Sequence, residues 1–298
     1  MGQTPQSAVP VEAASRAATT VARRIGRSDD RLRLLRSGTN VVFRADDLVL
    51  RVSQNRGDVA TQVGLVSWLS DQGVPALCPI ADPFTVDGLT VTIWEFIDGH
   101  QEIDYRQLGG AVSALHRLGP ASVAEHVALP WCGDATWLDL DANIGAAAES
   151  GVVGGDDIAV LRAAAREMAG WQEMARQEHL VVCHGDVHPQ NVLMRDDVLL
   201  ILDWDSICLG PAAWDHAALL TWAERWGGDE RDYAAFAAGY GTDLRNSAPA
   251  QLLARVRLLA PTINMIAKGG SSARHADEAR LRMRYWRGEL RPPPWTPQ

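Results

Sequence analysis

The sequence is poor in lysine and cysteine and contains no long apolar run. Lys268 is the only lysine among 28 basic residues, so no other lysine is available to bind a phosphate group. No cationic segment followed by an apolar run lies near Met1, and no stretch is long enough to span a bilayer, which predicts a soluble, cytoplasmic protein without a membrane partner. Structural disulfides are not expected, and no metal-ligand spacing relates the four cysteines, which are Cys78, Cys132, Cys183 and Cys208.

The negative charge of the chain is confined to its second part. Residues 1–97 contain ten basic and ten acidic residues, whereas residues 98–298 contain 18 basic and 27 acidic residues, which gives the net charge of −9. A negative field attracts a cationic small molecule and repels nucleic acid, so no nucleic-acid partner is expected. Ordinary solubility charge explains the same excess equally well.

Two polar clusters, each directly after a short apolar run, are the most informative feature of the chain. Residues 184–191 have the sequence HGDVHPQN and follow the apolar run 180–183. Residues 203–205 have the sequence DWD and follow the apolar run 199–202. Both runs predict short buried strands, and a third strand is predicted at 192–194, followed by a turn. Each strand therefore ends by bringing a polar group to a rim, where carboxylates require a cationic partner.

Three oxygen-bearing side chains in these clusters suit a phosphoryl-transfer site. Mg²⁺ prefers oxygen ligands and keeps several waters, so the carbonyl of Asn191 and the carboxylate of Asp203 suffice together with ATP phosphates. Asp186 is placed to accept a hydrogen bond from the attacking hydroxyl and to orient it. A turn with an asparagine cap and a packed tryptophan explains each piece alone, but the three pieces in this order favour a functional site.

The combination HGDVHPQN…ILDWD resembles the aminoglycoside phosphotransferase and choline kinase-like families, which are distant relatives of the protein kinases. The resemblance implies that Asp186 is the catalytic base and that Asn191 and Asp203 bind Mg²⁺. It implies ATP as the nucleotide, with GTP not excluded. It also implies two supporting residues: His184 orients the catalytic loop and Asp215 braces it.

Two further positions in this region bear on the resemblance. Asp205 either reaches a second Mg²⁺ or bonds backbone, and the backbone bond is favoured. A protein kinase is not expected, because Gly185 stands where the arginine of the HRD motif would be. In addition, only seven residues separate Asp203 from Pro211, which is too few for a phosphorylated activation segment.

The resemblance also implies an α+β, bilobal protein kinase-like fold. A small N-terminal antiparallel β-sheet lobe, residues 1–97, would bind the nucleotide, and a larger, mainly helical lobe, residues 98–298, would be catalytic and bind the substrate. Periodicity and turn residues predict the elements. Helices are expected at 11–25, 58–70, 105–118, 157–177, 210–226, 252–267 and 276–290, further strands at 32–35, 41–44, 48–52, 77–80 and 89–97, and irregular structure at 119–155.

The nucleotide is expected to contact a hairpin loop, a strand and the hinge between the lobes. Backbone N–H groups of the loop would meet the β-phosphate, although a plain hairpin loop accounts for these residues too. Arg51 stands where related kinases have a lysine and can bridge two phosphates; an outward-facing strand charge is the alternative. The residues implied are Ser37, Gly38, Thr39, Asn40 and Arg51 and, at the hinge, Glu95, Phe96 and Ile97.

One position departs from the family pattern. In the family a glutamate on the helix expected at 58–70 pairs with the basic strand residue, whereas the best-aligned position here holds Gln62, with Asp58 one turn earlier. The sequence therefore does not identify the ion-pair partner of Arg51. A nucleotide-binding pseudokinase remains an alternative, although all three residues of the catalytic type are present.

The acceptor is expected to be a small cationic molecule. Most of the eleven tryptophans follow residue 130, and each of them belongs either to the core, which is favoured, or to an acceptor pocket. The pocket candidates are Asp134, Trp137, Trp222 and Trp226. The leading function is an ATP-dependent O-phosphotransferase for an aminoglycoside-like antibiotic, and antibiotic resistance is either its biological role or an incidental activity. The alternative is a kinase for choline, homoserine or a sugar, and nothing indicates the oligomeric state.

Overall fold

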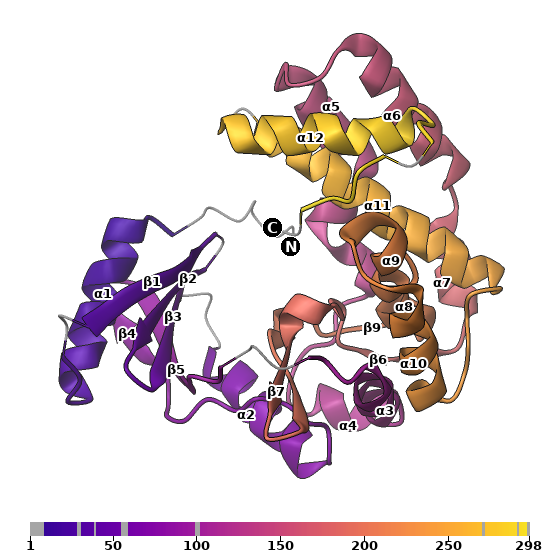
Figure 1. Cartoon of the computed structure of the whole chain (residues 1–298). Coiled ribbons are helices and arrows are strands. Elements are labelled where there is room, and N and C mark those ends of the chain that lie inside the picture. The colour runs from indigo at the N-terminus through magenta and orange to yellow at the C-terminus, as the bar shows by residue number, and fades with distance from the viewer. Residues whose placement is uncertain are drawn as a thin grey trace.

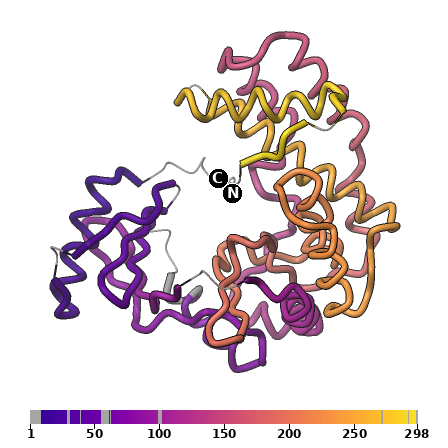
Figure 2. Tube along the Cα trace, viewed as in Figure 1, coloured from indigo at the N-terminus to yellow at the C-terminus, as the bar shows by residue number. Residues whose placement is uncertain are grey.

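The computed structural model describes residues 9–28, 31–38, 40–54, 59–98, 102–269, 272–290 and 292–296. The chain forms a small N-terminal lobe built on an antiparallel sheet and a larger, mainly helical lobe (Figure 1). This confirms the expected α+β, bilobal kinase-like architecture. In the Cα trace the indigo N-terminal lobe lies on the left and the yellow C-terminal helix at the top, and purple, magenta and orange segments connect them along the bottom and the right (Figure 2).

The sheet of the small lobe has five strands in the order β1-β2-β3-β5-β4. Burial alternates along β2 and β3, as it does in strands with one face in a core. The covering helix is α1 (Val11–Arg24), whose alanine-rich buried face lets it lie close to the sheet. The strands are β1 (Leu32–Ser37), β2 (Val41–Ala45), β3 (Leu48–Gln54), β4 (Phe84–Val86) and β5 (Leu89–Glu95).

Helix α2 (Val59–Asp71) follows β3 in the chain but packs on the larger lobe. Its buried residues Leu65 and Val66 share a core cluster with Val192 and Trp204, which lie far beyond the expected lobe boundary. The core of the small lobe consists instead of α1 and the strands. The boundary between residues 97 and 98 stays a prediction, and the apolar packing groups α2 with the second part of the chain.

The larger lobe is a helical body with two small two-stranded sheets. Strand β6 (Leu180–Cys183) pairs with β9 (Cys208–Pro211), and β7 (Val192–Arg195) pairs with β8 (Val198–Ile201), all antiparallel. The helices are α3 (Tyr105–His116), α4 (Pro120–Ala124), α5 (Leu140–Glu149), α6 (Gly155–Glu167), α7 (Trp171–Gln177), α8 (Ala213–Leu220), α9 (Trp222–Trp226), α10 (Glu230–Tyr240), α11 (Ala248–Lys268) and α12 (Ala273–Trp286).

Two glycines let α3 and α10 touch backbone to backbone. A Cβ added at Gly109 would lie 2.0 Å from the carbonyl oxygen of Phe236, and one added at Gly239 would lie 1.9 Å from that of Arg106. No side chain fits at either position without separating the helices. This contact supports α3, which carries His116 next to the catalytic loop.

Several expected elements are wrong. Residues 77–80 form no strand: Pro79 has no N–H to donate, and a single bridge joins Ala76 to Ile201. The region 119–155 is not irregular but contains α4 and α5. The helix expected at 157–177 divides into α6 and α7 around Gly170, whose φ is +83°. Residues 208–211 form a strand rather than a helix start, and α10 was not expected at all.

Across the described ranges, from residue 9 to residue 296 with their gaps, no helix is both long enough and apolar enough to cross a membrane.

Candidate active site

The catalytic loop begins where β6 ends, and its shape depends on Gly185. This residue has a φ of +85°, and a Cβ there would lie 2.1 Å from the carbonyl oxygen of Ser206. Only glycine therefore fits both the left-handed backbone and the close approach to the 203–205 segment. The glycine turns the chain so that the next residue, Asp186, leaves the strand and lies at the rim.

Asp215, near the start of α8, holds this loop by hydrogen bonds to its backbone. Its two carboxylate oxygens accept hydrogen bonds from the backbone N–H groups of His184 and Gly185, both at 2.8 Å, and one oxygen also lies 3.0 Å from Nε2 of His116. Burial raises the pKa of Asp215, but the hydrogen bond with His116 more than offsets this, so its pKa is lowered. Asp215 therefore remains an anion that fixes two consecutive loop amides.

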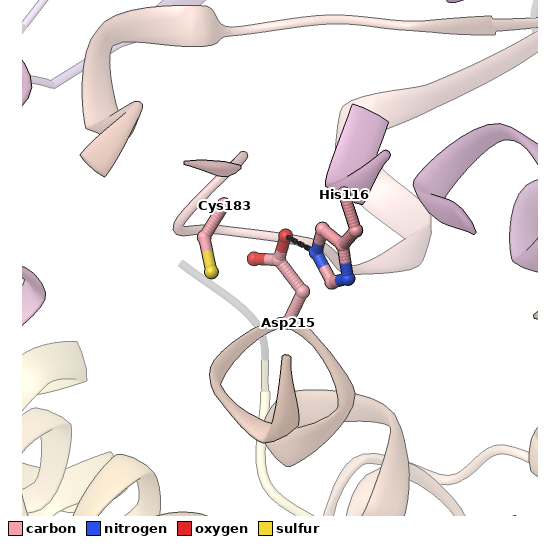
Figure 3. Close-up of side chains that lie close together, drawn as sticks. All are labelled: His116, Cys183 and Asp215. Atoms are coloured by element: carbon pink, nitrogen blue, oxygen red, sulfur yellow. Dashed lines mark hydrogen bonds and ion pairs between the residues drawn. The ribbon is translucent and has the colours of Figure 1, made fainter. Parts of the chain in front are cut away.

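Cys183, His116 and Asp215 lie close together, with their potential ligand atoms within 4.8 Å of one another (Figure 3). The other ring nitrogen of His116 contacts the hydroxyl of Tyr240 at 3.0 Å, and both oxygens of Asp215 already accept hydrogen bonds. The histidine and the carboxylate thus have partners without an ion. The cluster is a structural brace behind the loop.

His184 connects the two polar clusters of the sequence. Its Nε2 donates to the carbonyl oxygen of Leu202 at 2.8 Å, and its Nδ1 accepts the backbone N–H of Asp186 at 3.2 Å. The ring is fully buried with its edge toward Trp204, at a centroid distance of 4.7 Å. These bonds set the catalytic loop beside the 203–205 segment.

Asp186 is surrounded by hydrogen-bond donors. Its Oδ1 accepts from Nη2 of Arg257 at 2.8 Å, and its Oδ2 lies 3.3 Å from both Nδ2 of Asn191 and Nε2 of His188. Burial raises the pKa of Asp186, but the hydrogen bond from His188 and the charge of Arg257 outweigh it, so its pKa lies below the ordinary value. The carboxylate is therefore ionised and held in one orientation.

Arg257 is the site residue that the sequence analysis missed. It lies on α11, donates from Nη1 to the carbonyl oxygen of Gly185 at 2.6 Å, and has a side chain that is only 8% exposed. Its guanidinium carbon lies 5.5 Å and 5.1 Å from the ring centroids of Trp137 and Trp214. The sequence signal was the position of Arg257 inside the apolar segment LLARVRLLA. Burying an arginine in such a segment is costly unless a carboxylate pairs with it.

Asp203 and Asp205 face Arg51 across the lobes. Nη2 of Arg51 lies 3.2 Å from Oδ1 of Asp203, Nη1 lies 3.4 Å from Oδ1 of Asp205, and Nη2 also contacts Oδ2 of Asp205. Burial lowers the pKa of Arg51, but the two carboxylates reverse this and raise it. Asp205 was expected to bond backbone, and its partner is this guanidinium instead.

The same cluster contains the oxygen atoms that suit a divalent cation. Burial raises the pKa of Asp203, Arg51 opposes this, and the charge of Asp205 raises it further. A carboxylate whose charged form is disfavoured in this way gains from a cation. Asn191 donates from Nδ2 to the backbone oxygen of Asp186 at 3.0 Å, which leaves its carbonyl Oδ1 as the atom for a metal. The donor set fits Mg²⁺.

The expected nucleotide-binding residues lie at the edge of the small lobe. Ser37 ends β1, and Gly38 and Asn40 lie in the following loop, while Thr39 falls outside the described residues. With its amide oxygen turned toward Arg51, Asn40 accepts from Nε at 3.1 Å. Asn40 in the loop is therefore linked to β3 through Arg51, and both residues are expected to bind phosphate.

The hinge residues already have partners of their own. The carboxylate of Glu95 pairs with Arg195 at 2.6 Å, and the backbone N–H of Phe96 donates to Asp47 at 2.8 Å. An adenine contact at this point would therefore use the carbonyl oxygen of Phe96 or the backbone of Ile97. The side chain of Gln62 lies outside the described part of the chain.

The four acceptor candidates divide into two groups. Trp222 stacks on His188 at 6.0 Å and Arg257 lies over Trp137, so these two rings contact partners of Asp186, while Trp226 stacks on Trp222 at 5.7 Å. Asp134 instead lies 4.0 Å from Arg176 and lines a depression of about 760 Å³ that contains no residue of the catalytic loop. The structure thus brings the aromatic candidates to the site and leaves the carboxylate apart from it.

This geometry can be compared with known proteins. A family model described as the phosphotransferase enzyme family matches residues 31–259. The chain belongs to this family. It is a phosphotransferase with an alcohol group of a small molecule as acceptor. A search of curated proteins gives no match.

Solved structures of several phosphotransferases have the same fold. Amicoumacin kinase hAmiN has a TM-score of 0.66 at 13% identity, with 94% of this chain and 96% of that chain covered. Spectinomycin phosphotransferase APH(9)-Ia has a TM-score of 0.64 at 14% identity, with 95% and 94% covered. A choline/ethanolamine kinase family protein from Mesorhizobium loti has a TM-score of 0.63 at 20% identity, with 93% and 95% covered. The fold is thus common to kinases of different small molecules.

Proposed function

We propose that this phosphotransferase moves the γ-phosphoryl group of Mg·ATP to a hydroxyl of a small cationic molecule, with aminoglycoside-like antibiotics as the leading candidates. The arrangement around Asp186 supports this most strongly. Its carboxylate is ionised and oriented by Arg257 and His188, with Asn191 beside it. The charged segment with Asp203 is linked to the same loop through His184.

Asp186 would act mainly by orienting the acceptor hydroxyl. In a loose phosphoryl-transfer transition state the nucleophile loses its proton late, so a fixed hydrogen-bond acceptor matters more than a strong base. An aspartate whose pKa is lowered suits this task, because it stays ionised when the hydroxyl arrives. Arg257 would keep that carboxylate in position from the side opposite to His188.

Asp203 and Asn191 would hold Mg²⁺, which supplies charge neutralisation at the phosphate oxygens when it is bound. Arg51 would then direct donors toward the α- and β-phosphates, with backbone N–H groups of the loop at Ser37 and Asn40 beside it. The hinge residues Phe96 and Ile97 would receive adenine, and GTP is not excluded.

Two observations support a cationic acceptor of the antibiotic type. Residues 98–298 contain 27 acidic and 18 basic residues, and this acidic excess would raise the local concentration of an ammonium compound. Structures with the same fold are described as complexes with spectinomycin and with streptomycin. Trp137 and Trp222 would form the walls next to Asp186.

A small-metabolite kinase is the second candidate. The fold likeness to a choline/ethanolamine kinase family protein favours it, and so do the tryptophan rings beside the catalytic loop. Aromatic faces attract quaternary ammonium groups, so choline would suit such a wall. Homoserine and sugars belong to the same group of candidate acceptors.

An acceptor screen tests the proposal. The purified protein with Mg·ATP would be offered spectinomycin, streptomycin, choline, ethanolamine and homoserine, with ADP release and the mass of the product both measured. We expect one ammonium-bearing compound to gain a phosphate group. ATP binding without transfer to any acceptor in a widened panel would support the pseudokinase instead.

A further inference from the structure

Arg51 is held by a carboxylate from an unexpected element. It lies on β3 in register with Val42 of β2 and Thr92 of β5, so the sheet fixes its backbone on both sides. Its Nη1 and Nη2 both contact the carboxylate of Asp205, with Nη1 at 3.4 Å from Oδ1. A two-point pair of this kind fixes the plane of the guanidinium as well as its position.

Helix α2 offers no equivalent partner. Along its sequence, VATQVGLVSWLSD, the one acidic residue is Asp71 at the very end. The buried face of this helix, with Leu65 and Leu69, is used for packing against the larger lobe. A carboxylate that orients Arg51 must therefore come from outside α2.

Asp203 is poorly suited to be the permanent partner. It lies 3.2 Å from Arg51, but it is also the carboxylate that fits a metal, so a bound cation would compete with the guanidinium for it. Asp205 lies two residues further on, within the single helical turn at 204–206, and contacts Nη1 of the guanidinium as well as Nη2. Its pairing survives if Asp203 turns toward a cation.

We propose that Asp205 is the positioning partner of Arg51 and takes the place of a carboxylate on α2. This inference depends on the proposed nucleotide site. Asp205 holds the Nη1–Nη2 edge of the guanidinium, and phosphate oxygens would then take the donors that Asp203 and Asn40 accept in this structure. A lysine has no such planar fork, which explains why an arginine suits this position.

The test is nucleotide affinity in a double-mutant cycle. Dissociation constants for ATP, ADP and adenosine are measured by calorimetry for the wild type, Asp205→Asn, Arg51→Gln and the double variant, with Mg²⁺ and with EDTA. We expect Asp205→Asn to weaken ATP and ADP about tenfold in both buffers and to leave adenosine unchanged. The double variant should bind no more weakly than Arg51→Gln. Asp205→Glu should restore most of the affinity.

Three results would overturn the inference. Additive losses in the double variant would mean that the two residues act independently. A loss confined to the Mg²⁺ buffer would make Asp205 a metal ligand. Reduced adenosine affinity would indicate general damage to the fold, although Asp205 has a side chain that is 45% exposed and lies outside the core.

Two acidic residues that flank or end α2 serve as controls. Asp71→Asn should bind all three nucleotides as the wild type does. If Asp58→Asn, just before α2, reproduces the loss and Asp205→Asn does not, the partner lies at the helix start and the inference fails. A wild-type protein that binds no ATP at all would instead refute the proposed function, which keeps the two failures distinct.

Discussion

At the scale of single residues, Arg257 connects a distant helix to the carboxylate of Asp186. It contacts both Asp186 and the carbonyl oxygen of Gly185, so it fixes the carboxylate relative to its own backbone. Such preorganisation matters for the rate more than for substrate binding. Removing the charge of Arg257 is therefore expected to lower kcat.

Arg257→Met retains the length of the side chain and removes its charge. We expect kcat to fall between about 10-fold and 100-fold, while KM for ATP changes less than about threefold. Steady-state kinetics with the acceptor found in the screen measures both. Arg255→Met is the matched control on the same helix, because Arg255 pairs with Glu167 at the surface. Equal losses of kcat in the two variants would show that Arg257 has no specific role at Asp186.

His216 makes stability depend on pH. It is fully buried on α8, and burial lowers its pKa to about 4. The unfolded chain, with a pKa of about 6.5, takes up the proton first as pH falls. The contribution of His216 to the free energy of unfolding is therefore fully present above a pH of about 6.5. It decreases by up to about 3 kcal/mol as the pH falls toward 4.

His216→Phe should remove this part of the pH dependence. Urea unfolding at several pH values compares it with the wild type and with His179→Gln, at an exposed position. The difference in unfolding free energy between wild type and His216→Phe should change across this interval. A constant difference would show that the histidine does not titrate with folding.

At the scale of elements, the contact between α3 and α10 carries a prediction about packing. Gly239→Ala places a Cβ 1.9 Å from the carbonyl oxygen of Arg106, so the helices must separate, at a cost of about 1–3 kcal/mol or more. Gly145→Ala in α5 is the control, because no heavy atom lies within 4 Å, and it should be neutral or stabilise by up to about 1 kcal/mol. Thermal unfolding measures both. Similar melting temperatures for the two variants would contradict the packing account.

The strands around the catalytic loop were predictable because the apolar runs at 180–183 and 199–202 are short and bounded by polar residues. Strand β9 was not, since it forms only as a partner of β6 and ends with Gly210-Pro211, a pair that elsewhere opens a helix. Helix α10 was missed although Asp229 and Asp232 form a capping box. Local signals specify the motif, and distant pairing specifies its surroundings.

The same difference between local signals and distant contacts applies to the partners of the site residues. The motif predicted that Asp186 and Asp203 would lie near each other, because neighbouring strand ends deliver them. It gave no account of Arg257, which is 71 residues away from Asp186 in the sequence, or of the contact between Arg51 and Asp205. Contacts between residues so far apart depend on how the helices pack, which periodicity does not encode.

At the scale of the whole molecule, nucleotide binding should link the lobes and stabilise the fold. A ligand at about 100 times its Kd raises the free energy of unfolding by about 2.7 kcal/mol. Part of this should depend on Mg²⁺ through Asp203. Asp203→Asn should keep the backbone, because asparagine tolerates its φ of +59°, and should remove the additional stabilisation that Mg²⁺ gives to the ATP complex.

Melting temperatures with ATP, with and without Mg²⁺, measure that difference. The control is Asp196→Asn, in the turn between β7 and β8, where φ is also positive and the side chain is exposed. It should respond to Mg²⁺ as the wild type does. An unchanged Mg²⁺ response in Asp203→Asn would contradict the ligand role.

The most direct test of the account compares phosphoryl transfer and ATP affinity in the wild type and in Asp186→Asn. The substitution keeps the shape of the side chain and removes the charge that orients the hydroxyl. We predict a transfer rate at least about 100-fold lower, with the Kd for Mg·ATP within about threefold of the wild type. A rate close to that of the wild type, or an equal loss of rate and nucleotide binding, would contradict it.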